Sequence, residues 1–189
     1  FVHYDHFDPE VMIDKGPKIA RVATRLTPRE FSDGYIFVLD ADDLLHPKLV
    51  DYMLTTGDRK GYIIRSGYMM DAESGTFATL CKNIFKNLNF AGYFSSHCGS
   101  CVGVRVNLSR GPEQLTPLLK RSKHSTQHHA LAAYGMAPRV VPFPAALYLI
   151  NHGENMRLRR GKQDIKLRYL QRFKVSPHKA QKIRAEFGL

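Results

Sequence analysis

Two patterns of apolar residues alternate along this chain: short continuous runs and longer stretches with helical spacing. Residues 35–39 form a continuous apolar run, which is typical of a strand buried on both faces. Helical spacing follows at Leu49, Val50 and Met53, after a His46–Pro47 pair that is expected to begin a helix. A buried strand followed closely by an amphipathic helix is the repeating unit of α/β proteins.

The remaining pattern predicts further alternation of strands and helices. Strands are expected at 61–70, 100–106, 139–143 and 146–150, with a turn at 71–75. Helices are expected at 17–26, from 125 or 126 to 134, and after Gly161, with Pro177 opening the last one. Residues 1–4 are typical of the end of a strand that begins before the chain does. The order predicts an α/β fold with a mostly parallel, mixed sheet flanked by helices, in which ligands bind at the carboxyl ends of strands.

Charge is distributed unevenly over the 189 residues. The net charge is +11, and from Asn151 onward 11 Lys and Arg face 3 Asp and Glu. This excess suggests an anionic partner such as a membrane surface, nucleic acid or an acidic polymer. Three cysteines argue against a disulfide framework and favour a reducing, cytoplasmic compartment. No window approaches the roughly 18 apolar residues that a membrane-spanning helix needs.

Three carboxylates, Asp40, Asp42 and Asp43, follow the apolar run at 35–39. Like charges this close repel each other unless a cation or a polyhydroxyl ligand offsets them. Carboxylate oxygens suit Mg²⁺ or Mn²⁺, which in turn bind phosphate oxygens. The alternative is a solvated turn in which the aspartates cap a helix. An EF-hand loop is excluded because its glycine and terminal glutamate are absent at the required offsets.

The segment 35–47, YIFVLDADDLLHP, resembles the Asp-x-Asp segment of family 2 glycosyltransferases, which have the GT-A fold. Two other segments resemble parts of the same family. Upstream, residues 14–21 are similar to its Gly-Lys-Gly helix start, and downstream residues 148–155 are similar to a late segment that carries a histidine near the metal. The resemblance covers roughly residues 1–155 and implies a catalytic domain there, with a basic helical extension at 156–189.

The resemblance implies roles for individual residues. Asp40 would contact the nucleoside of a nucleotide-sugar donor. Asp42 and His152 would bind the Mn²⁺ or Mg²⁺ ion that bridges the donor diphosphate. Asp43 would bind water or the acceptor. A divalent ion suits this chemistry because sugar transfer expels a nucleoside diphosphate, on which negative charge grows.

Two further groups of residues each have more than one possible role. Lys15, Lys18 and Arg21 would help to hold the nucleotide, or they form an exposed basic face of a helix. His128 and His129 stand where inverting members carry an acidic pair that includes the catalytic base. A histidine serves as a general base near neutral pH, but it also binds metals and caps helices.

A Cys-x-x-Cys pair, Cys98 and Cys101, is too little for a zinc site, and His97 alone does not complete one. A redox pair would need a thioredoxin-like context, which is missing. The preferred interpretation is a turn of small residues that lines the acceptor side of the pocket, with Gly99 and Ser100 as candidates.

We therefore expect an enzyme that transfers a sugar from a nucleoside diphosphate to a hydroxyl acceptor: a glycan, a lipid-linked molecule or a polysaccharide, as in cell-envelope synthesis. The basic extension would lie on the inner face of an anionic membrane or simply pack on the domain. One alternative is a Mg²⁺-dependent nucleotidyltransferase, whose Gly-rich loop is not in this chain. Another is a nucleic-acid-binding module, but the charge is confined to the tail, and no nucleic-acid partner is expected.

Overall fold

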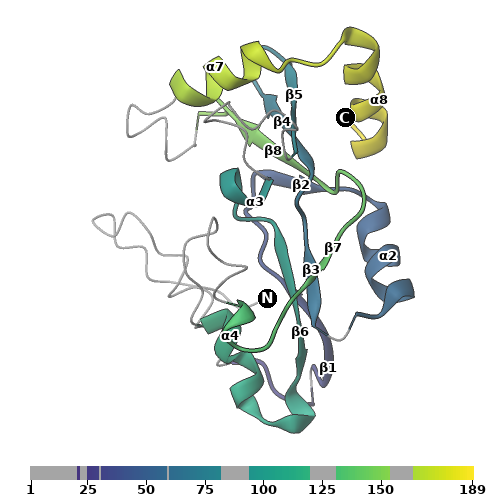
Figure 1. Ribbon diagram of the computed structural model, residues 1–189, viewed down its shortest axis with the longest axis vertical. Helices are drawn as coiled ribbons and strands as arrows, with labels where there is room; N and C mark the ends of the chain where they lie inside the picture. The colour runs from purple at the N-terminus through teal and green to yellow at the C-terminus, as the bar shows by residue number, and fades with distance from the viewer. Residues whose placement is uncertain are drawn as a thin grey trace.

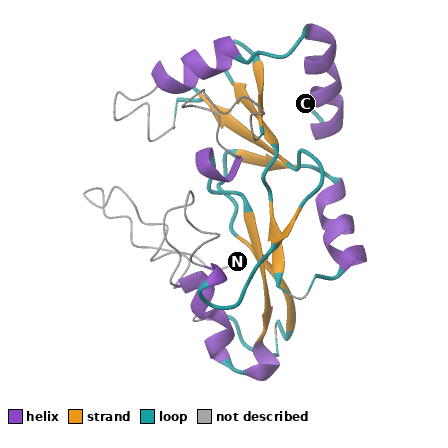
Figure 2. Cartoon of the chain, in the orientation of Figure 1, coloured by secondary structure: helices purple, strands orange, loops and turns teal. Residues whose placement is uncertain are grey.

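The computed structural model describes residues 21, 25–29, 31–58, 60–81, 94–119, 131–153 and 164–189. It has an α/β fold with two four-stranded mixed sheets, which follow one another along the long axis (Figure 1, Figure 2). Sheet A contains, in spatial order, β1 (Asp33–Phe37), β6 (Val102–Asn107), β3 (Gly61–Ile63) and β7 (Arg139–Val140). Sheet B contains β2 (Asp43–Leu45), β8 (Ala146–Ile150), β4 (Gly67–Asp71) and β5 (Phe77–Leu80).

Helices flank both sheets. They are α2 (Lys48–Thr56), α3 (Phe94–His97), α4 (Thr116–Leu119), α7 (Asp164–Arg172) and α8 (Pro177–Phe187), with 3-10 turns η1 (Leu108–Arg110) and η2 (Pro112–Leu115). Figure 1 shows α2 beside sheet A and both α7 and α8 beside sheet B. None of the described helices combines the length and the apolar character needed to cross a membrane.

The α/β class is confirmed, but the expectation of a mostly parallel sheet is wrong for the described strands. Four of their six pairings are antiparallel, and only β3–β7 and β4–β8 are parallel. Connection length explains part of this difference. A parallel pair needs a crossover of a dozen or more residues, whereas the short turn at 72–76 returns the chain from β4 directly into β5.

The single strand expected at 61–70 is in fact two strands in different sheets. β3 ends at Ile63 and β4 begins at Gly67. Between them, the Ile64 amide donates to the Cys101 carbonyl at 2.7 Å, and the Ser66 carbonyl accepts from the Ala145 amide at 3.1 Å. The links β1–β2 and β7–β8 also carry the chain from sheet A to sheet B. The links β2–β3 and β5–β6 return it to sheet A, so five links join the two sheets.

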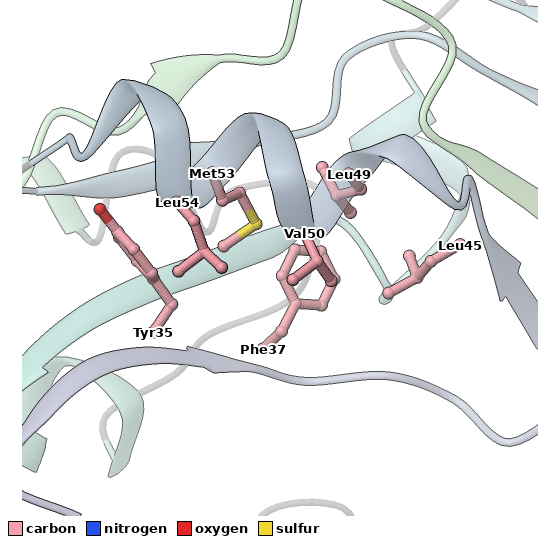
Figure 3. A pocket seen from close by; sticks show the side chains of 7 residues that line it. All are labelled: Tyr35, Phe37, Leu45, Leu49, Val50, Met53 and Leu54. Carbon is pink, nitrogen blue, oxygen red and sulfur yellow. The ribbon is translucent and has the colours of Figure 1, made fainter.

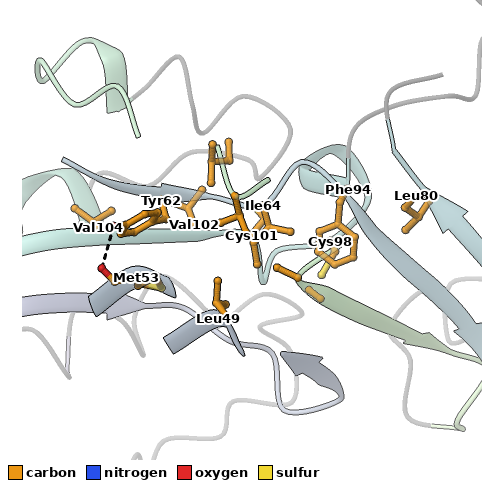
Figure 4. Packing of buried hydrophobic residues seen from close by; sticks show 14 of the residues in the cluster. Leu49, Met53, Tyr62, Ile64, Leu80, Phe94, Cys98, Cys101, Val102 and Val104 are labelled. Carbon is orange, nitrogen blue, oxygen red and sulfur yellow. Dashed lines mark hydrogen bonds between the residues drawn. The ribbon is translucent and has the colours of Figure 1, made fainter. Parts of the chain in front are cut away.

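Helix α2 follows the predicted pattern and shows how the core of sheet A is built. Leu49 and Met53 are buried on the sheet, whereas Val50 is 60% exposed. The buried Tyr62 ring belongs to the same cluster as Leu49 and Met53, and its hydroxyl donates to the Met53 carbonyl at 3.0 Å (Figure 4). That bond matters because a buried phenol without a partner would cost free energy.

The C-terminal segment covers sheet B. Helix α8 begins at Pro177, as expected, and the Ser176 hydroxyl caps it by accepting from the Lys179 amide. Phe187 of α8 packs edge-on against the Tyr68 ring of β4, and Leu170 of α7 is fully buried. The described part of 156–189 therefore contributes directly to the hydrophobic core.

Replacing Phe187 with Ala should destabilise the protein by about 3–5 kcal/mol, because the side chain is only 8% exposed and little can fill its place. Urea unfolding followed by circular dichroism measures this change. Leu189→Ala is the matched control, since Leu189 is 50% exposed and its loss should change stability by less than about 0.5 kcal/mol. Equal effects of the two substitutions would mean that α8 does not pack on sheet B in solution.

Candidate functional site

The three aspartates lie where the chain passes from sheet A to sheet B. Asp40 and Asp42 are on the link between β1 and β2, and Asp43 is the first residue of β2. The Asp43 amide donates to the Asp40 carbonyl at 3.1 Å, which closes a tight turn. The Asp40 amide donates to the Ser100 hydroxyl oxygen at 2.8 Å. The turn is therefore stabilised by its own backbone hydrogen bond and by the bond to Ser100, which precedes β6.

Asp43 is the buried member of the group, with 4% of its surface exposed. Its Oδ2 atom accepts hydrogen bonds from the Ser100 hydroxyl at 2.6 Å and from the Cys98 thiol at 2.9 Å. Its Oδ1 atom is also buried, and no described group donates to it. Burial raises the pKa of Asp43 to about 6, although the bonds from Cys98 and Ser100 oppose this change.

Helix α3 positions the two side chains that hold Asp43. Phe94, its first residue, is fully buried against Gly67, where an added Cβ would lie 2.3 Å from the ring and 2.5 Å from the Ala146 carbonyl oxygen. Only glycine permits this approach. The Cys98 amide then donates to the Phe94 carbonyl at 3.0 Å, which orients the turn at 98–101.

The Cys-x-x-Cys turn contacts the carboxylate of Asp43. Burial raises the pKa of the Cys98 thiol, so it stays neutral and donates to Asp43. Gly99, Ser100 and Cys101 are buried as well. Of the two acceptor candidates in this turn, Ser100 contacts both Asp40 and Asp43.

Asp42 and His152 are brought together from positions 110 residues apart, with His152 Nε2 2.8 Å from Asp42 Oδ2. Their side chains are 35% and 18% exposed, so both remain accessible from solvent. The structure therefore brings together the two residues that the resemblance assigned to one metal ion. β1 and β8 belong to different sheets. The contact arises because β2 pairs antiparallel with β8, with Asp43 opposite Tyr148.

Lys166 is a site residue that the sequence analysis missed. It belongs to α7 and is only 6% exposed, and its ammonium lies 3.9 Å from the centre of the Tyr148 ring. Burial lowers the pKa of Lys166 to about 8, against the attraction of the Asp43 and Asp42 carboxylates. Its sequence position suggested one more basic residue of an exposed tail, and no local pattern marks it as different.

Lys15, Lys18, His128 and His129 lie outside the described residues. Arg21 is described, and it is helical and exposed.

No family model, curated protein or solved structure matches this chain.

Asp42 and His152, which contact each other directly, could supply two ligands to a divalent cation that takes its other ligands from elsewhere. Two ligands at right angles on an octahedral cation, each about 2.1 Å away, lie about 3.0 Å apart. The 2.8 Å between Asp42 Oδ2 and His152 Nε2 is close to that value. Within the described residues, no group of three or more His, Cys, Asp and Glu side chains assembles a metal site. A cation held here would need phosphate oxygens and water to complete its shell.

A cavity lies apart from the aspartates, between β1 and α2 (Figure 3). Its volume is about 220 Å³, and its lining is almost entirely apolar: Tyr35, Phe37, Leu45, Leu49, Val50, Met53 and Leu54. Tyr35 carries the lining's one side-chain hydroxyl, which donates to the Asp58 carbonyl. None of the three aspartates lines this cavity, so it is distinct from the Asp42–His152 site.

Asp43→Asn should stabilise the metal-free protein at pH 7.5. A pKa of about 6 in the folded state, against the usual 3.8, means that folding favours protonated Asp43. Its contribution to stability is complete below about pH 4 and is lost as the pH rises through 6, a change of about 3 kcal/mol. The buried amide of Asn offsets part of the gain. Urea unfolding in EDTA from pH 4 to 8 should show a flatter profile for the variant.

Asp33→Asn is the matched control, because the pKa of Asp33 is lowered whereas that of Asp43 is raised. Asp33 is a surface carboxylate whose hydrogen bond from Arg105 lowers its pKa, so its loss should not stabilise the protein at pH 7.5. A less stable Asp43→Asn variant at that pH, with an unchanged pH profile, would contradict the assigned cost of burying Asp43.

Proposed function

We propose that this chain is a metal-dependent glycosyltransferase that uses a nucleoside diphosphate sugar. The observation that carries the proposal is the contact between Asp42 and His152. These are the two residues to which the family resemblance assigns the metal, and they come from separate motifs. A carboxylate and an imidazole that remain accessible suit a Mn²⁺ or Mg²⁺ ion delivered with a diphosphate.

The chain's own residues would divide the work. Asp42 and His152 would hold the cation, which supplies positive charge to the diphosphate leaving group. Asp40 would contact the nucleoside, and its amide is already fixed by Ser100. Asp43 is buried beneath the link and would support it, since its contacts are with Ser100 and Cys98 rather than with solvent.

The reaction would exchange one bond at the anomeric carbon of the donor sugar. The acceptor hydroxyl oxygen bonds to that carbon while the bond from carbon to the diphosphate oxygen breaks. The nucleoside diphosphate leaves with the electron pair, and the hydroxyl proton passes to a base. We propose His128 or His129 as that base, because in the sequence they stand where inverting family 2 glycosyltransferases carry an acidic pair.

Asp42→Ala should abolish Mn²⁺-dependent binding of nucleoside diphosphates and their sugars, whereas His152→Ala should weaken it. The two effects should be non-additive in the double variant, because both ligands act through one ion. Isothermal titration across a Mn²⁺ series measures donor affinity, and thermal shifts identify the preferred nucleotide beforehand.

Asp51→Asn, which removes an exposed carboxylate in the first turn of α2, is the control and should bind donor like the wild type. Wild-type donor affinity in His152→Ala would contradict the shared site. Two other outcomes would point to the alternatives: binding of nucleoside triphosphates alone to a nucleotidyltransferase, and salt-sensitive binding of DNA without any nucleotide effect to a nucleic-acid-binding module.

We also propose that the basic C-terminal helices contact an anionic membrane, where a lipid-linked acceptor would be found. Arg172, Lys174 and Lys182 are exposed, and each basic residue near such a surface contributes about 1 kcal/mol. Replacing all three with Gln should therefore weaken binding to phosphatidylglycerol vesicles by roughly a hundredfold at low salt. Deleting the segment would be a poor test, because Leu170 and Phe187 belong to the core. Unchanged vesicle affinity in the triple variant would exclude this contact.

A further inference from the structure

Asn151 lies between β8 and His152 and has an unusual backbone conformation. Its φ angle is 60°, and it is the one non-glycine residue at positive φ among the described residues. Asn tolerates this left-handed region better than most residues do, but it stays there only where its surroundings determine it. Asn151 directly follows Ile150, the last residue of β8, and the chain bends at the next two residues. The next residue, His152, then faces Asp42.

The Asn151 side chain is fixed by two carboxylates. Its amide group Nδ2 donates to Asp71 Oδ1 at 3.0 Å and to Glu73 Oε2 at 2.5 Å. Both hydrogens of the amide group are thereby used. The contacts cross from the end of β8 to the end of β4, its parallel neighbour in sheet B.

Asp71 is a firm anchor for this contact. It is the last residue of β4 and is 5% exposed. Its Oδ2 accepts from the Ser74 hydroxyl at 2.5 Å, and its Oδ1 accepts from the Glu73 amide at 3.2 Å. The Ala72 amide donates to the Ile150 carbonyl at 2.9 Å, which ties the two strand ends together. Burial alone would raise the pKa of Asp71, but hydrogen bonds from Ser74 and Asn151 lower it overall, so the anchor is an anion at neutral pH.

We propose that Asn151 and Asp71 are positioning residues that set the direction of His152 toward Asp42, and through it the affinity of this pair for a divalent cation. The part that concerns the cation rests on the proposed function. The part that concerns the direction of His152 rests only on the contacts above. Partners that orient a metal-binding histidine commonly change metal affinity by about 10- to 100-fold when they are removed.

The experiment compares Asn151→Ala with Asn151→Gly. Alanine loses the amide contact and disfavours positive φ, whereas glycine loses the contact but adopts positive φ freely. Asn107→Ala is the matched control: it removes an asparagine cap that accepts from the Ser109 amide, in sheet A. Two measurements are made on each protein. The ¹⁵N imidazole spectrum of His152, in metal-free buffer, reports its hydrogen bond to Asp42, and Mn²⁺ titration with a nucleoside diphosphate reports cation affinity.

Asn151→Ala should shift the His152 resonances and weaken Mn²⁺ affinity by roughly 10- to 100-fold, Asn151→Gly should do so less, and Asn107→Ala should do neither. His152 resonances that are unchanged in Asn151→Ala would overturn the proposal. If wild-type protein binds no Mn²⁺ with any nucleoside diphosphate, the proposed function fails, and the imidazole spectrum still decides whether Asn151 directs His152. Asp71→Asn, which retains an acceptor but loses the charge, should shift the His152 resonances less than Asn151→Ala does.

Discussion

The burial of one carboxylate, that of Asp43, organises the whole site. Its Oδ2 atom accepts hydrogen bonds from the Ser100 hydroxyl and the Cys98 thiol, and its main chain pairs with Tyr148 in β8. Three parts of the chain that are distant in sequence thus meet at one residue. A buried charge is costly unless it is well hydrogen-bonded, and here only one of its two oxygens has partners among the described groups. The fold retains the charge despite that cost.

Asp43 and its neighbour Asp42 lie in different surroundings. Asp42 lies in the turn closed by the bond from the Asp43 amide to the Asp40 carbonyl, whereas Asp43 is the first residue of β2. The two neighbours differ in exposure: 4% for Asp43 and 35% for the Asp42 side chain. One aspartate then supports the link while the other is available to a ligand. The pairing of β2 with β8 brings the end of β8, and with it His152, to the same place.

The parts of this arrangement that the sequence predicted are those with local signals. Strand β8 has the expected bounds, α8 begins at Pro177, and the turn before β5 lies at 72–76, one residue from the expected 71–75. Strand β2 was not foreseen, because three residues are too few to show a period and the adjoining histidine and proline suggested only a helix start. The division of 61–70 into two strands was missed because both halves are equally apolar. Lys166 was missed because its burial depends on α7 docking against Tyr148, which no neighbouring residue indicates.

Three departures from ordinary structural preference lie close together in this molecule. Asp43 and Lys166 are buried charges, and Asn151 has a left-handed backbone. The first two flank Tyr148, and the third adjoins His152. Each of these three features lowers stability, and a single substitution could remove each of them. Features of this kind are expected where a protein holds groups in a geometry that binding requires, since stability alone would remove them. By contrast, the buried hydroxyl of Tyr62, in the core of sheet A, has its partners in Met53 and Asp58. The concentration of unfavourable features around Asp42 and His152 is therefore an argument for function there that is independent of any motif.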